Sequence, residues 1–280
     1  SIQQTFNGSV GYGQRVTATI SRNGDLISRA YLVLGVGSTA TTLSPYFGLR
    51  VIKHAEVEIG GQRIDKHYSD WMYIWNELSM PVGKKEGYYE MIGGGGGDLS
   101  DKSLYVPLEF WFCRNIGLAL PLIGLQYHEV KINIQFEEST YVLNASNSAE
   151  AGTLSAALWV DYIYLDTDER RKFAQSSHEY LIEQLQFTGK ESASNKIKLN
   201  FNHPVKELVW VVHKPSNTQV TANNNWFNYT ATPDVVTAPA SAGKTYASLC
   251  TSLGPSGTAA NAVTQGKLIL NGNDRFYSRD

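Results

Sequence analysis

The sequence predicts an all-β protein with two sandwich-like or jelly-roll domains in tandem. Short apolar segments with strand-like alternation recur along most of the chain, and one stretch has a convincing helical period. The length of 280 residues fits one large β domain or two ordinary ones. Charged residues make up 18% of the chain, below the roughly 25% of most soluble domains. We therefore expect a protein that buries much of its surface, either in a core or against neighbours.

The first predicted strands lie near the N-terminus. Residues 14–21 alternate between apolar and polar side chains, and Asn23-Gly24 is a strong tight-turn pair that leads into a return strand at 26–34. Residues 54–59 alternate in the same way, and Gly60-Gly61 ends that strand.

One helix is predicted from Lys66 to Met80. Asp65 can cap its N-terminus, and Pro81 ends it. Its apolar residues, two of them tryptophans, recur at three- and four-residue steps. They are Tyr68, Trp71, Met72, Trp75 and Leu78. A helix with so aromatic a face should pack onto the end of a sheet, or help to pack domains or subunits.

Five consecutive glycines, Gly93 to Gly97, predict a flexible connector, because polyglycine has the largest backbone entropy. The run lacks the Lys-Ser/Thr ending of a phosphate-binding loop. Strands are predicted again on the C-terminal side of this run, at 104–112, 127–136, 154–165, 178–187, 196–201, 206–212 and 267–270.

The domain boundary is predicted in the charged stretch 167–177. This gives a first jelly roll at 1–172, a linker at 173–177 and a second jelly roll at 178–280. Residues 214–265 are rich in Asn, Thr, Ala, Ser, Gly and Pro, which predicts long surface loops.

Charge and composition argue against several classes of protein. The net charge of −2 gives no basic surface to neutralise phosphates, so direct nucleic-acid binding is not expected. The two cysteines, Cys113 and Cys250, are too few for a disulfide framework and are expected as buried free thiols. The N-terminal residues do not resemble a signal peptide, and the most apolar stretch, 104–125, contains charges and prolines that do not suit a membrane span.

No residue pattern predicts catalysis, a metal or a cofactor. The six histidines form no H-x-H or H-E-x-x-H pair, which disfavours a metal-dependent cupin. Nucleophile elbows, kinase motifs and dinucleotide-binding motifs are absent from the sequence. Four clustered carboxylates are better explained as a charged strand end and loop than as a catalytic pair: Asp161, Asp166, Asp168 and Glu169.

Three N-x-S/T sequons occur, at Asn7, Asn144 and Asn228. The last two fall in loop-like sequence, so Asn144 and Asn228 are weak candidates for glycosylation. Chance occurrence is the simpler explanation for all three.

Six collinear segments closely resemble the major capsid proteins of nucleocytoplasmic large DNA viruses, in particular the phycodnaviruses. The most specific are GGQRIDKHY and GLALPLIGLQYHEV, and the six span 21–32, 55–79, 105–136, 159–189, 199–210 and 268–276. The resemblance implies two successive eight-stranded jelly rolls, with a short helix in a loop of the first. Family chains continue past the match to Arg275-Phe276, so the second roll is expected to be incomplete here.

The same resemblance implies a structural role. Family members form homotrimeric, pseudo-hexagonal capsomers that tile an icosahedral shell over an internal membrane. The implied partners are neighbouring capsomers and minor capsid proteins, and the implied location is the virion capsid, assembled in the host cytoplasm. Outer loops of algal-virus relatives can carry glycans.

Two alternatives remain beside the major capsid protein. One is a minor or accessory capsid paralogue. The other is a carbohydrate-binding jelly-roll module in which Trp226, Phe227 and Tyr229 form a stacking platform. A jelly-roll enzyme is disfavoured by the missing ligand sets.

Overall fold

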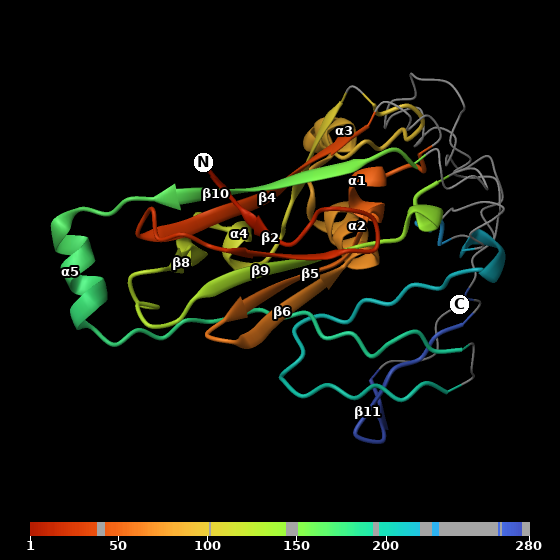
Figure 1. Ribbon diagram of the computed structural model, residues 1–280. Coiled ribbons are helices and arrows are strands. Elements are labelled where there is room, and N and C mark those ends of the chain that lie inside the picture. The colour runs from red at the N-terminus through yellow and green to blue at the C-terminus, as the bar shows by residue number, and fades with distance from the viewer. Residues whose placement is uncertain are drawn as a thin grey trace.

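A computed structural model of the protein describes residues 1–37, 43–100, 102–143, 151–192, 196–218, 226–229, 263 and 265–275. Within these ranges, the strands of residues 1–163 form two antiparallel sheets that face each other (Figure 1). The first sheet has the order β1-β10-β4-β7, with β8 also paired to β4, and the second has the order β2-β3-β9-β5-β6. The strands are β1 (Ile2–Gln4), β2 (Phe6–Asn7), β3 (Arg15–Thr19), β4 (Leu26–Val36), β5 (Ile52–Ile59), β6 (Gln62–Tyr68), β7 (Ser103–Pro107), β8 (Leu120–Pro121), β9 (Val130–Phe136) and β10 (Leu154–Ile163).

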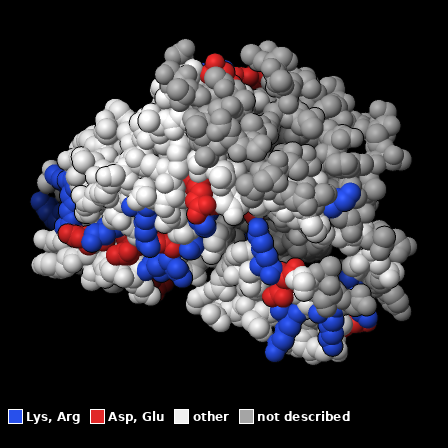
Figure 2. Space-filling view, turned by 45° about the vertical axis from the view of Figure 1, so that its right-hand side comes forward, with Lys and Arg blue, Asp and Glu red and all other residues white. Residues whose placement is uncertain are grey.

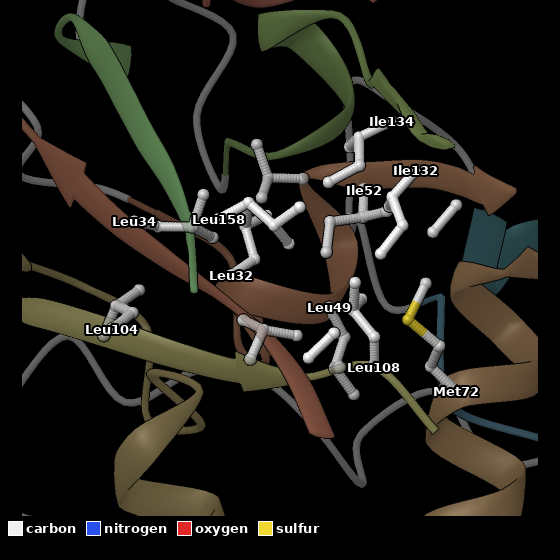
Figure 3. Close-up of a cluster of buried hydrophobic side chains, with 14 of the residues drawn as sticks. Leu32, Leu34, Leu49, Ile52, Met72, Leu104, Leu108, Ile132, Ile134 and Leu158 are labelled. Carbon is white, nitrogen blue, oxygen red and sulfur yellow. The ribbon is translucent and has the colours of Figure 1, made fainter. Parts of the chain in front are cut away.

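The core lies between the two sheets (Figure 3). Leu32 and Leu34 of β4 and Leu158 of β10 enter it from the first sheet. Ile132 and Ile134 of β9 enter from the second. Each such fully buried side chain contributes about 1.5–3 kcal/mol of transfer free energy. Because successive strand residues point to opposite faces, this alternation also fixes which side chains face outward.

Helices lie at both ends of the sandwich (Figure 1). At one end are α1 (Phe47–Arg50), α2 (Ser69–Ser79) and α3 (Val82–Met91), and at the other is α5 (Thr167–Gln175). A single turn, α4 (Trp111–Arg114), lies against β4. The short 3₁₀ turns are Ile116–Leu118, Ser139–Tyr141 and Pro215–Thr218.

The predicted helix exists but begins three residues later than expected. Residues 66–68 belong to β6, which pairs with β5 across the Gly60-Gly61 turn. Asp65 is therefore a strand residue opposite Val57, and the prediction that it caps the helix is wrong. Pairing with β5 gives the backbone groups of these residues hydrogen-bond partners, whereas the first N–H groups of a helix have none within the helix.

Helix α3 has no counterpart in the prediction, because Gly83 and Gly87 weaken its helical signal. Neither glycine has an atom within 4 Å of the position that a Cβ would occupy. We expect Gly87→Ala to stabilise the protein by about 0.5–1 kcal/mol, since alanine loses less backbone entropy in a helix. A urea denaturation curve measures this, and an unchanged or lower midpoint would contradict it.

The glycine run is not a flexible connector, so that prediction is wrong. Gly97 and Leu43 exchange two backbone hydrogen bonds of 2.8 and 3.1 Å. Gly94 donates to the carbonyl of Tyr89 at 2.8 Å and accepts from the amide of Tyr46 at 3.2 Å. The glycines are needed because the chain turns tightly here beside other backbone, with φ of +61° at Gly96.

Several predicted strands differ from the structure. The strand predicted at 104–112 ends at Pro107, where the chain turns toward α4, and the strands at 127–136 and 154–165 are shortened to β9 and β10. The segments 178–187, 196–201 and 206–212 form no strand, because no described strand pairs with them. The last predicted strand is reduced to β11 (Ile269–Leu270), which pairs with β12 (Asn273–Asp274).

Helix α5 occupies the charged stretch in which the domain boundary was predicted. Asp166 caps it by accepting a hydrogen bond of 2.8 Å from the amide of Glu169. The helix runs into the predicted linker at 173–177. Most of the predicted loop 214–265 lies outside the described residues.

Candidate functional site

No catalytic centre is visible in the described part of the chain. It holds no group of three His, Cys, Asp or Glu residues that could bind a metal ion. Burial lowers the pKa of His54 to about 4, with Lys66 adding to the effect, so this imidazole is neutral at pH 7. Burial also raises the pKa of the Cys113 thiol, so the protonated form, which is a poor nucleophile, is favoured at pH 7. Cys250 lies outside the described residues.

The four carboxylates considered as a catalytic pair have separate structural roles. Asp161 accepts from the Ser1 hydroxyl, and Asp166 caps α5. Asp168 pairs with Arg171 at 3.6 Å, and Glu169 follows it in the first turn of α5. Asp161 lies near the end of β10 as expected, but the predicted loop is the N-terminus of α5, where Asp166 is the N-cap and Asp168 and Glu169 lie in the first turn.

A surface groove of about 320 Å³ lies beside the end of β3. Arg22 borders it and donates to the carbonyl of Leu125 at 2.6 Å. Tyr127 and His128 also line it, but nothing about the groove resembles a catalytic arrangement. No helix among the described residues is long and apolar enough to cross a bilayer.

The face seen in Figure 2 has no continuous basic surface. Lysine and arginine side chains lie next to aspartates and glutamates in mixed clusters. The mixed charges of the described residues on this face agree with the net charge of −2.

Buried polar contacts hold α5 against the two sheets of residues 1–163, which we call the first β domain. Asp25, in the turn between β3 and β4, is 2% exposed. Its carboxylate accepts from the Leu165 amide at 2.8 Å and from Arg170 Nε at 2.9 Å. Its backbone bonds the Ile163 carbonyl and the Leu122 amide. One residue therefore connects the β3–β4 turn, the chain after β8, the end of β10 and α5.

A second connection is made by residues 180–187, which we call the junction segment. Tyr180 packs against the core, donates to the carbonyl of Leu118 and accepts from Trp111 Nε1 at 3.1 Å. Glu183 pairs with Arg114 at 2.9 Å. The guanidinium of Arg114 also lies 4.3 Å from the ring centre of Trp75 in α2.

The junction segment also reaches β6 through the buried Asp65. The Asp65 carboxylate accepts from the Leu185 amide at 3.1 Å and lies 2.9 Å from His67 Nε2. The His67 ring stacks on Phe110 with centroids 4.7 Å apart. The residue predicted as a helix cap thus holds the junction segment on the first β domain. Sequence periodicity could not reveal this, because the contact joins residues 120 positions apart.

A charged cluster covers the outward face of the second sheet. Glu56, which is 5% exposed, pairs with Arg15 at 2.9 Å and with Lys66 at 3.1 Å. Burial alone would raise the pKa of Glu56, but the hydrogen bond and charge of Lys66 and the charge of Arg15 hold it below its ordinary value. The ionised form is therefore favoured in the folded state.

The folded-state pKa of Glu56 is depressed. Its contribution to the free energy of unfolding is therefore complete above the ordinary carboxylate pKa and is lost as pH falls through the folded-state pKa. We expect Glu56→Gln to lower the free energy of unfolding by about 1–2 kcal/mol at pH 7 and by less in acid. Urea denaturation at pH 7 and pH 3 measures this. Glu129→Gln, whose exposed carboxylate pairs with Lys131, is the control and should change little.

Neither the described candidate glycosylation site nor the proposed aromatic platform lies open on the surface. Asn144 lies outside the described residues, and Asn228 is 2% exposed. Glycosylation of Asn228 would require this buried amide to become accessible. The aromatic residues proposed as a sugar platform pack inward: Phe227 stacks on Tyr73 at 4.5 Å, and Trp226 lies under Arg50 at 4.1 Å.

Comparison with known proteins identifies similar chains over the whole sequence. The family described as "Major capsid protein N-terminus" matches residues 1–166, and the family described as "Large eukaryotic DNA virus major capsid protein" matches residues 169–280. The chain is 61% identical to the major capsid protein of Pyramimonas orientalis virus, covering 75% of this chain and 55% of that protein. It is 42% identical to the major capsid protein of Paramecium bursaria Chlorella virus 1, covering 100% of this chain and 66% of that protein.

Solved structures give the same result for the fold. The chain is 38% identical to a chain of the PBCV-1 virus capsid quasi-atomic model, with a TM-score of 0.81 over 99% of this chain and 70% of that chain. PBCV-1 VP54, fitted into a reconstruction of the virophage Sputnik, gives a TM-score of 0.79 at 36% identity. The predicted all-β jelly-roll fold is thereby confirmed. The chain spans about half the length of several of the curated relatives that it matches, including 55% of the Pyramimonas protein.

Proposed function

Because the chain belongs to the major capsid protein family of large eukaryotic DNA viruses, we propose that the full-length protein is the main building block of an icosahedral virus shell. The observation that carries this proposal is the likeness over 99% of the chain to a virus capsid chain, at a TM-score of 0.81. The two family matches, which together cover nearly every residue, support it.

The full-length protein forms homotrimeric capsomers in this proposal. Each chain contributes two jelly rolls, the first over 1–172 and the second from 178 onward, joined at 173–177. The buried contacts of Asp25 and of the junction segment support a chain whose parts are held as one block. A rigid block suits tiling, because a shell needs the same angles between neighbours at every repeat.

Further partners follow from the same role. The capsomers contact other capsomers and minor capsid proteins, and the shell lies over an internal membrane without binding the genome directly. The protein resides in the virion capsid and is assembled in the host cytoplasm. Its role is structural in this proposal and involves no catalysis, in keeping with the capsid family to which the chain belongs. Asn144 and Asn228 remain the weak candidates for glycan sites, and attachment at Asn228 requires its buried amide to become accessible.

Light scattering after size exclusion of the full-length protein tests the proposed function. A mass of three chains that persists at micromolar concentration is the expected result. A stable monomer would favour an accessory jelly-roll protein, and a glycan-binding measurement would then test the carbohydrate-binding alternative.

A further inference from the structure

The outward faces of the two sheets differ in chemistry. On the first sheet, Trp159, Tyr31 and Pro107 lie in one row across β10, β4 and β7, and Ala157, Val33 and Tyr105 lie in the next. We call these six residues the neutral face. The following row, Ser155, Gly35 and Ser103, is also uncharged.

The neutral face is separate from the core. The residues that alternate with it, such as Leu32, Leu104 and Leu158, point inward and are almost fully buried. None of the six neutral-face residues belongs to the core cluster or is packed against it. Tyr105 on the edge strand β7 is 42% exposed, and the others are half-buried. Three adjacent strands therefore present aromatic and aliphatic side chains outward.

The second sheet presents the opposite chemistry outward. Glu56 has its cations there, and Thr17 donates to Asn133, which in turn donates to Glu58. These groups are paired within the sheet and suit contact with water. Packing two copies of such a charged face together would require desolvating many ions.

We propose that the neutral face is where a second copy of this chain packs. The proposal rests on the proposed function, in which many copies form one shell. A patch without charges can meet another copy of the chain without like-charge repulsion. At its border, Arg29 and Asp161 carry opposite charges and lie opposite each other in register, so their charges offset each other. Tryptophan and tyrosine are the residues that most often dominate binding energy at such contacts.

Tyr105→Glu in the full-length protein tests the neutral face. It places one charge on an exposed edge position, where folding should tolerate it, and should weaken self-association at least about 30-fold. Tyr127→Glu is the matched control, since Tyr127 is 89% exposed and lies outside the neutral face. Analytical ultracentrifugation across a concentration series measures the dissociation constants, and thermal melting checks that both variants fold.

Hydroxyl-radical labelling gives a second, variant-free readout. Trp159 and Tyr105 should be protected in the concentrated wild type and become labelled on dilution, whereas Tyr127 stays labelled throughout. Protection that does not change on dilution would mean that the same chain covers the face, and would overturn the proposal. An oligomer that survives Tyr105→Glu unchanged would overturn it too, while leaving the capsid function intact. A wild type that never associates would count against both.

Discussion

Asp25→Ala should lower the free energy of unfolding by about 2–4 kcal/mol and release α5 from the first β domain. The Asp25 carboxylate is buried and serves the Leu165 amide and the Arg170 guanidinium together. Alanine leaves the amide without its acceptor and Arg170 without its partner. The denaturation midpoint in urea and hydrogen exchange of the α5 amides measure the two effects.

Two variants separate the buried carboxylate from general loss of charge. Asp25→Asn keeps the shape and one acceptor oxygen, so it should be intermediate. Asp168→Ala removes a carboxylate that is 90% exposed, and should have no measurable effect. Equal effects of Asp25→Ala and Asp168→Ala would show that Asp25 does not hold α5.

Gly96→Ala should destabilise the protein by about 3 kcal/mol or more. At Gly96 a Cβ would lie 2.6 Å from the Leu43 carbonyl oxygen and 2.8 Å from the Pro45 nitrogen, and backbone atoms cannot move aside cheaply. The positive φ adds a further cost for any L side chain. The melting temperature and the denaturation midpoint should both fall.

The neighbouring Gly97 provides a matched control. Its φ of +76° is also left-handed, but nothing lies within 4 Å of its Cβ position. Gly97→Ala should therefore cost only the conformational term, about 1–2 kcal/mol. If both variants lose the same stability, the close approach at Gly96 is unimportant and the glycine run is looser than described.

The first β domain was largely predictable from the sequence because alternation reports burial directly. The inward residues of β3, β4, β5 and β10 follow the pattern that their sequences predict. The errors came where two patterns overlapped. Residues 66–68 carry both strand alternation and helical spacing, and the hairpin with β5 decides between them.

Local sequence patterns misled the prediction at the glycine run and in the junction segment. Polyglycine indicates flexibility only when nothing else packs on it, and here the backbone of Leu43 to Tyr46 does. The junction segment alternates like a strand, yet its polar residues bind β6 and α4 through single side chains. Such contacts depend on residues distant in sequence, which no local pattern encodes. The family resemblance, by contrast, was readable from a few long motifs.

Quantitative mass spectrometry of purified virus particles tests the central claim most directly. The full-length protein should be the most abundant virion protein, with a copy number far above that of any other shell component. A copy number comparable to that of minor components, or absence from particles that are otherwise complete, would contradict the account and favour an accessory capsid paralogue.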